Sequence, residues 1–176
     1  MQNFEYLVTE HGFRLAESEP NRVRFESETV YVEVTYDGHR SYELDLLVGR
    51  VGSEEAPFRI DEIVKLRQAD KAYSSSLVQV TTAEALSSKL EQLARLLSEF
   101  GRDFISGHEG SFREAAMQRS NDVDRYARER ALRAARAEAE EAWRKKDYHR
   151  FVMLMRPLRA HLSDEELSKL EVAERR

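Results

Sequence analysis

Polar and apolar residues alternate along four segments in the first third of the chain. These segments are residues 13–19, 23–28, 29–36 and 41–51. In the last two, one set of alternate positions is apolar or aromatic: Val30, Val32, Val34 and Tyr36, then Tyr42, Leu44, Leu46 and Val48. A period of two residues is typical of a strand with one buried face, and Asp37-Gly38 is a hairpin-turn signal. The pattern predicts an antiparallel β-meander of about four strands.

Helical patterns flank this sheet. Residues 3–11 space their apolar side chains by three or four positions before Gly12, which indicates a short N-terminal helix. A long helix is predicted from Thr81, which has capping-box spacing with Glu84, to Gly101. Its apolar stripe consists of Leu86, Leu90, Leu93, Leu97 and Phe100. That stripe needs an apolar surface, and the buried face of the sheet supplies one.

These elements predict an α+β domain over residues 1–106. Between its last long strand and the leucine-rich helix, residues 56–60 are predicted as a short edge strand or an extended approach. Residues 61–68 are predicted as a short helix. Residues 71–80 hold a serine run followed by Leu-Val-Gln-Val, which is typical of either a last strand or a loop.

Residues 107–176 are predicted to form an all-helical extension. Ser111 and Glu114 again have capping-box spacing, and an alanine- and arginine-rich run without Gly or Pro continues to Lys146. Ser, Asn and Asp favour helix ends over helix interiors, so residues 119–122 leave open whether this long helix is interrupted.

The extension ends in a helical hairpin. Asp147 is a good N-cap, Pro157 ends or kinks the first short helix, and Ser163 with Glu166 forms a capping box for the second. No second copy occurs at a period of about 34 residues, so the hairpin is not one unit of a repeat array. We expect it to close the long helix back on itself.

Three aromatic residues near this hairpin are candidates for contact with a partner: Trp143, Tyr148 and Phe151. They are expected either to pack in a core or to anchor an interface, and a structural role is the favoured interpretation. The C-terminal helices are also a candidate surface for a homodimer.

The composition narrows the class of protein. Charged residues make up 35% of the chain and hydrophobic residues 41%, so much of it must be solvated surface. Residues 1–112 carry a net charge of −8 and residues 113–176 one of +3, within a total of −5. In the basic part, glutamates are interleaved with the arginines, which argues against nucleic-acid binding.

The chain has no cysteine, which excludes disulfides, thiolate catalysis and zinc–thiolate sites. No window approaches the roughly 18 apolar residues of a membrane span, and the polar N-terminus does not resemble a signal peptide. We therefore expect a cytoplasmic protein of bacterial type that does not bind a membrane.

Catalytic motifs are lacking. The glycines form no phosphate-binding loop, the five histidines are scattered without metal-ligand spacing, and the serine run has no nucleophile-elbow glycines. We expect no cofactor, no bound metal and no enzymatic activity.

The strands do offer a candidate surface. If their apolar positions face the core, several polar side chains share the opposite face, and five of these are candidates for partner binding: Glu26, Tyr31, Glu33, Glu43 and Asp45. Catalysis by paired carboxylates needs a cleft that separates their pKa values, which an open sheet face does not provide. The alternatives are a solvated sheet face and an acidic docking surface for a basic protein.

Five segments of the α+β part form a distinctive series: His11-Gly12-Phe13, Val-Arg-Phe-Glu-Ser at 23–27, Val-Tyr-Val-Glu-Val at 30–34, Ser-Tyr-Glu-Leu at 41–44 and the leucine helix ending in Glu-Phe-Gly at 99–101. In these segments the chain resembles a family of small uncharacterised bacterial cytosolic proteins. In size and in its acidic sheet the chain is similar to toxin-immunity proteins. It also resembles secretion chaperones, which place a helix before an antiparallel sheet and a long helix on it.

The sequence thus predicts a non-enzymatic protein-binding protein, immunity-like, whose acidic sheet face contacts a basic protein partner. The alternatives are a self-associating helical scaffold and a secretion-chaperone-like protein.

Overall fold

The computed structural model describes residues 2–67 and 80–176 and has an α+β fold. Helices take up 61% of it and strands 17%, which confirms the predicted fold class. The chain divides into two compact units, Met1–Arg119 and Ser120–Arg176. Each unit has a hydrophobic core of its own.

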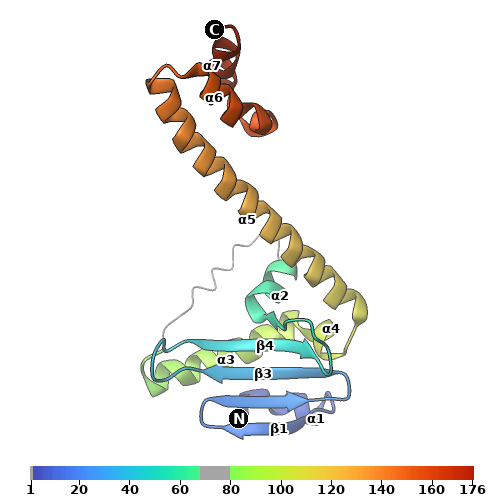
Figure 1. The fold of residues 1–176 in the computed structure, drawn as a ribbon. Helices are drawn as coiled ribbons and strands as arrows, with labels where there is room; N and C mark the ends of the chain where they lie inside the picture. Colours follow the sequence, from blue (N-terminus) through green and yellow to red (C-terminus); the bar gives the residue numbers. More distant parts are fainter. Residues whose placement is uncertain (1, 68–79) are drawn as a thin grey trace. The chain divides into compact units, whose positions relative to one another are not determined.

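The first unit contains a five-stranded antiparallel sheet (Figure 1) in the order β1-β2-β3-β4-β5. The strands are β1 (Arg14–Glu19), β2 (Arg22–Glu26), β3 (Val30–Tyr36), β4 (Leu44–Arg50) and β5 (Phe58–Arg59). The helices are η1 (Gln2–Phe4), α1 (Glu5–Thr9), α2 (Ile60–Arg67), α3 (Ala83–Phe100), α4 (Arg102–Ile105) and the beginning of α5 (Glu109–Arg144). The predicted meander is confirmed, and β5 is the predicted short edge strand.

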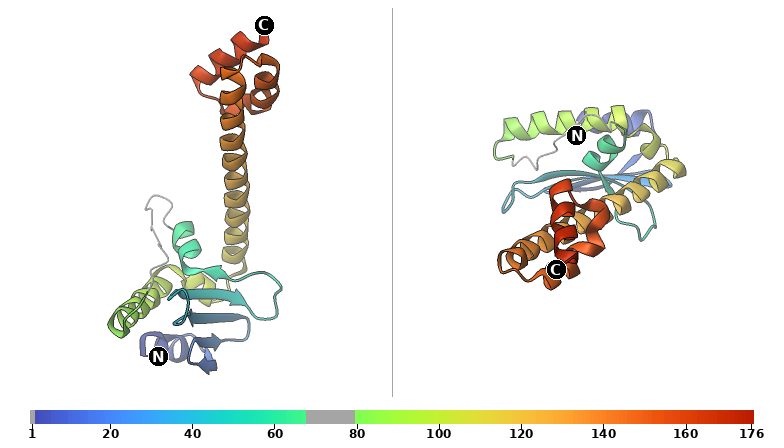
Figure 2. Two further views of the ribbon diagram at one scale, coloured as in Figure 1. Left: turned by 60° about the vertical axis from the view of Figure 1, so that its left-hand side comes forward. Right: turned by 90° about the horizontal axis from the view of Figure 1, so that it is seen from above.

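The sheet buries one face. Alternate side chains of β3 and β4 are buried there, namely Val30, Val32, Val34, Leu44, Leu46 and Val48. Helix α3 covers this face (Figure 2) through Leu93 and Leu97, as the leucine stripe predicts. Burial of such side chains is the main stabilising term, at about 25 cal/mol per Å² of apolar surface.

An aromatic group closes the core at the end of the sheet. The ring centroid of Phe104 lies 5.0 Å from that of Phe112 and 6.2 Å from that of Phe58. Phe112 belongs to α5, so the first turns of this helix pack within the first unit. The compact unit therefore extends past residue 106, to Arg119. The domain boundary at residue 106 stays a prediction from the sequence.

Several predicted helix ends are wrong. The N-terminal helical segment ends at Thr9, not at His11, and α3 begins one residue later than predicted, with Thr82 rather than Thr81 as N-cap. The hydroxyl oxygen of Thr82 accepts a hydrogen bond from the amide of Ala85 at 3.2 Å. Thr81 and Thr82 are adjacent and either hydroxyl can cap a helix, so the capping-box spacing to Glu84 predicts the wrong threonine.

The predicted helix start at Ser111 is also wrong. Helix α5 begins at Glu109, and Ser111 lies inside it, nearly fully buried. Its hydroxyl oxygen accepts a hydrogen bond from the guanidinium of Arg67 at 2.9 Å. The hydroxyl that the sequence predicts as a helix cap thus binds a side chain distant in the sequence. Residues 119–122 are helical and do not interrupt α5. Of the segment 71–80, only Val80 lies among the described residues.

The second unit contains the rest of α5, then α6 (Tyr148–Met155), the 3₁₀-helix η2 (Arg156–His161) and α7 (Asp164–Glu174). Its core consists of Ala139, Ala142, Phe151, Met155, Leu170 and Ala173. Small alanines on α5 let α6 and α7 approach closely, which confirms that the hairpin closes back on the long helix.

Local signals fix the ends of these short helices. Asp147 caps α6 and accepts a hydrogen bond from the amide of Arg150 at 3.0 Å. Pro157 stands where α6 gives way to η2, as predicted. Ser163 and Glu166 form the predicted capping box at α7.

The two cores can be distinguished by unfolding. Trp143 is the only tryptophan of the chain and packs in the second core, so its fluorescence reports that unit. Leu97→Ala should destabilise the first unit by about 2–5 kcal/mol and leave the Trp143 urea transition unchanged. Leu170→Ala should shift the Trp143 transition instead. Equal shifts of the fluorescence transition in both variants would show that the units unfold as one.

Acid should weaken the second unit through Glu166. Hydrogen bonds from Arg136 lower the pKa of Glu166 from its ordinary 4.5 to about 2, despite partial burial, and Ser163 lowers it further. Because the folded pKa is depressed, this stabilisation is present above about pH 5 and is lost as the pH falls towards 2.

Glu166→Gln should therefore lower the thermal midpoint of Trp143 fluorescence at pH 7 and reduce its decline between pH 5 and pH 2. The matched control is Glu165→Gln, since Glu165 is exposed and its one ion pair among the described residues is with Lys169 on its own helix. A decline of equal size in both variants would contradict the assignment to Glu166.

Candidate functional site

The strands bring most of the predicted partner-binding residues of the sheet onto its outer face, opposite α3. Glu26 lies opposite Tyr31 across the β2–β3 pair, and Glu33 lies opposite Arg24. Asp45 lies opposite Thr35 on the next pair of strands. Glu43 immediately precedes β4 and is half-buried. Within the first unit, no helix among the described residues is positioned on this face in Figures 1 and 2.

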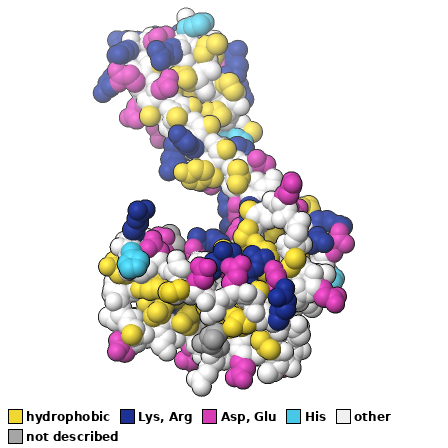
Figure 3. Space-filling view, turned by 60° about the horizontal axis from the view of Figure 1, so that its bottom comes forward, with side chains coloured by type: hydrophobic (Ala, Val, Ile, Leu, Met, Phe, Trp, Pro, Cys, Tyr) yellow, Lys and Arg dark blue, Asp and Glu magenta, His cyan; other side chains and the backbone are white. Residues whose placement is uncertain are grey.

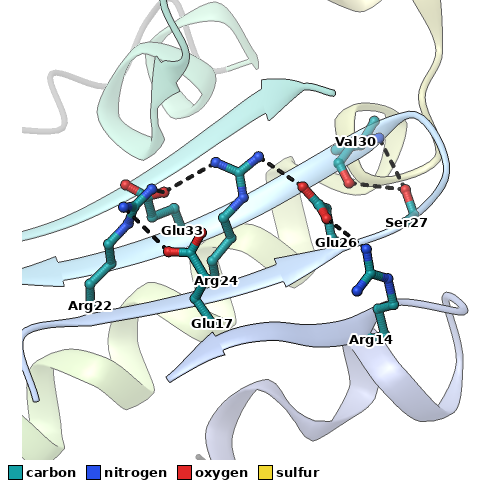
Figure 4. A network of polar contacts seen from close by, with 8 residues as sticks. All are labelled: Arg14, Glu17, Arg22, Arg24, Glu26, Ser27, Val30 and Glu33. Atoms are coloured by element: carbon teal, nitrogen blue, oxygen red, sulfur yellow. Dashed lines mark hydrogen bonds and ion pairs between the residues drawn. The ribbon is translucent and has the colours of Figure 1, made fainter. Parts of the chain in front are cut away.

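The carboxylates of this face are held in a continuous row of ion pairs, which we call the ion-pair ladder. It runs across β1, β2 and β3 through Glu17, Arg22, Glu33, Arg24, Glu26 and Arg14 (Figure 4). The shortest contact joins Arg22 Nη2 to Glu33 Oε2 at 2.7 Å, and Arg24 Nη2 lies 2.9 Å from Glu26 Oε1. The hydrogen bond that Arg22 donates to the Glu33 carboxylate raises the pKa of Arg22.

The ladder contains three arginines and three glutamates, so its formal charge is zero. Counting only the carboxylates therefore overstates how acidic this face is. Basic and acidic side chains are likewise interleaved on the surface seen in Figure 3. The cations Arg14 and Arg22 are missed by the sequence argument, although the alternation of Arg22 and Arg24 along one strand places both on the outer face.

Tyr31 is packed between a cation and a glycine. The guanidinium carbon of Arg24 lies 3.7 Å from the ring centroid, a cation–π contact. On β4, Gly49 lies opposite Tyr31, and a Cβ at Gly49 would stand only 2.4 Å from Tyr31 Cζ. The absence of a side chain at Gly49 is thus what lets the ring lie flat on the sheet. Burial raises the pKa of Tyr31, an effect that Arg24 opposes.

The β4–β5 end of the face keeps more negative charge. Arg59 Nη2 lies 2.6 Å from Asp45 Oδ1, and Arg59 Nε lies 3.3 Å from Asp61 Oδ1. Glu43 forms no ion pair among the described residues, so this end holds three carboxylates and one cation. Burial raises the pKa of Asp45, Arg59 lowers it, and the neighbouring Glu43 and Asp61 raise it further. We call Glu43, Asp45 and Asp61 the acidic end.

The aromatic candidates of the second unit pack together. The ring centroid of Trp143 lies 5.5 Å from that of Tyr148 and 5.1 Å from that of Phe151. Phe151 is 3% exposed and belongs to the core, while Trp143 and Tyr148 are half-buried against it. Of the two interpretations that the sequence leaves open, core packing accounts for these contacts.

The described residues of the second unit line hollows on its surface. One, of about 600 Å³, lies beside the N-terminal end of α6 and the C-terminal end of α7, and Arg156 and Glu174 on its lining form an ion pair at 3.0 Å. Another, of about 560 Å³, lies between α5 and η2 and has a more apolar lining. Among residues 2–67 and 80–176, no three His, Asp or Glu side chains are grouped in a way that could hold a metal ion. The described helices include none that could cross a membrane.

The chain matches no protein-family model, and no curated protein or solved structure is significantly similar to it. The resemblance to small bacterial proteins of the immunity type therefore stays a prediction from the sequence.

The fit of Tyr31 against Gly49 gives a direct test of the packing on this face. Gly→Ala in a strand interior is normally stabilising by about 0.5–1 kcal/mol, but Gly49→Ala should destabilise by about 1–3 kcal/mol because the ring must move. In a Tyr31→Ala background the same change should lose this cost. Urea unfolding of the four proteins of this double-mutant cycle measures the coupling. An equal effect of Gly49→Ala in both backgrounds would contradict the packing argument.

Proposed function

We propose that this chain is a non-enzymatic protein-binding protein, and that the outer face of β1–β4 is its binding surface. The observation that carries the proposal is a sheet face that the described helices of its own unit leave uncovered, with a row of ion-paired polar side chains across β1–β3. An immunity-like role in the bacterial cytosol is the form of this function that the sequence resemblance suggests.

The ion-pair ladder prepares this face for binding. Exposed ion pairs add little to stability, typically about 0–1 kcal/mol each. However, Glu33 and Arg24 are only 12% and 19% exposed as side chains, so the ladder holds them in defined positions. A partner that contacts side chains already ordered loses less conformational entropy on binding. Arg24 and Tyr31 are also of the residue types that dominate binding energy at interfaces.

The acidic end concentrates the negative potential at one end of the face. With the ladder neutral, the acidic end is the main source of negative potential on this face, because Glu43, Asp45 and Asp61 share a single cation, Arg59. A basic group of the partner would be attracted to this end, while the rest of the interface rests on the Arg24–Tyr31 pair. The expected partner is therefore a protein with a local basic group rather than a broadly cationic surface.

Self-association through the C-terminal helices is a second candidate. The supporting observation is that Val123 and Tyr126 on α5 are each 62% exposed, although they are large apolar side chains in the second unit. Neighbouring turns of a helix bring positions three apart onto one side, so the two form a small exposed patch.

The sheet-face proposal is tested by using the tagged full-length protein and its variants as baits. The proteins that each bait captures are compared by quantitative mass spectrometry, and binding to the purified partner is then measured. Tyr31→Ala should weaken binding at least about tenfold, mainly through faster dissociation. Glu43→Lys should slow association severalfold and reduce its dependence on salt.

The matched control is Glu99→Lys, which makes the same charge change at an exposed position of α3, on the opposite side of the unit. A partner bound equally by all variants would overturn the use of this face. Light scattering of each bait checks self-association, and a partner-free dimer would favour the second candidate.

A further inference from the structure

The hollow between α5 and η2, here named the α5–η2 groove, is lined by apolar side chains that the core does not use. Its floor is formed by Ala131, Leu132, Pro157 and Leu158. Among the described residues, neither Leu132 nor Leu158 belongs to the packed cluster of the second unit. These two leucines face an open space of about 560 Å³, in the range of ligand-binding pockets.

The chain forms this groove because of Pro157. A proline ring has no amide hydrogen and clashes with the carbonyl of the preceding turn, so α6 ends at Met155. The chain then continues as the tighter helix η2, which contains no buried residue. The side chains of η2 therefore border the core without filling it, and a hollow remains beside α5.

The rim of the groove on α5 is cationic. Arg125 and Arg128 line it, together with the single carboxylate of Glu129. The guanidinium of Arg128 donates only to the carbonyl oxygen of Asp124, at 3.2 Å, and pairs with none of the described carboxylates. Arg125 is paired at 2.7 Å with a carboxylate of the preceding turn, but the arginine is 59% exposed, where such a pair is weak and exchangeable. A net positive rim thus stands over an apolar floor.

We propose that the α5–η2 groove binds an acidic amphipathic segment of a partner protein. Its apolar side chains lie between Leu132 and Leu158, and its carboxylates lie against Arg125 and Arg128. This is the way an amphipathic helix occupies a hydrophobic groove. The cations favour an acidic rather than a basic segment, and the open shape admits a chain that passes through the site.

The lining argues against a nucleic acid as the occupant. Single-stranded nucleic acids bind by stacking bases on aromatic side chains along a basic track. No Phe, Tyr or Trp lines the α5–η2 groove, whose floor is aliphatic, and its one aromatic ring is the imidazole of His161. A phosphate backbone would leave Leu132 and Leu158 in contact with polar groups or water, whereas a leucine-bearing peptide covers them.

This inference does not depend on the proposed function of the sheet face. The groove lies in the second unit and uses none of the sheet residues. Arg128→Glu should leave binding of the sheet-face partner unchanged, and Tyr31→Ala should leave the groove unchanged, so either proposal can fail alone.

The test uses the full-length protein and a fluorescein-labelled synthetic peptide of about 15 residues, with leucines at helical spacing and glutamates elsewhere. Fluorescence anisotropy should show saturable binding with a Kd on the order of 10 µM. Arg128→Glu should weaken it at least about tenfold. Arg130→Glu makes the same change two residues away, at an exposed position outside the lining, and should change the Kd less than about twofold.

Three results would overturn the inference. The first is equal weakening by Arg128→Glu and Arg130→Glu, which indicates only general attraction to a basic helix. The second is equal binding of a peptide with lysines in place of the glutamates. The third is a set of peptide-induced amide NMR shifts that lies outside residues 125–132 and 157–161. An oligothymidylate that displaces the peptide in an Arg128-dependent manner would assign the groove to nucleic acid instead.

Discussion

The structure of the first unit depends on a sheet with one face buried in the hydrophobic core, under α3. Successive side chains of a strand point to opposite faces, so burying Val32 and Val48 under α3 places their neighbours Tyr31, Glu33 and Gly49 on the other face. The same constraint decides which polar groups become neighbours. The ion-pair ladder is therefore a consequence of the strand register that the core requires. Shifting one strand by a residue would disrupt both the buried core face and the ladder.

The ion pairs of the outer face hold its side chains in fixed positions and leave only a weak net electrostatic potential. Each glutamate of the ladder contacts at least one arginine, and Glu26 and Glu33 contact two each. The potentials of alternating charges cancel beyond a distance comparable to their spacing, and physiological salt screens the remainder over a Debye length of roughly 8 Å. What remains close to the surface is a set of fixed donors and acceptors around Tyr31, with negative potential left over only near Glu43. Under the proposed binding function, such a face would select a partner by its shape and polar pattern.

The second unit follows a different constraint, the shortage of large apolar residues on α5. Only its C-terminal part, with Ala139 and Ala142, packs closely against α6 and α7. The preceding turns are rich in arginine and stay exposed, and Pro157 keeps η2 from filling the space beside them. The apolar floor and basic rim of the α5–η2 groove are thus produced by the same sequence features that limit the core.

Features that depend on local periodicity and local caps can be predicted from the amino-acid sequence alone. The buried face of β3 and β4, the leucine stripe of α3, the cap at Asp147 and the Ser163–Glu166 box all involve residues a few positions apart. Their geometry is set by the backbone of one element, so spacing alone identifies them.

The pairing of groups far apart in the sequence depends instead on how the elements are arranged in space. Arg67 takes the hydroxyl of Ser111 from 44 positions away, so the capping box predicted there does not form. Arg14 and Arg59 reach the outer face from β1 and β5 and neutralise carboxylates that the sequence leaves uncompensated. Charge, unlike periodicity, acts through space, and the partner of each ion is known only once the strands have been placed side by side.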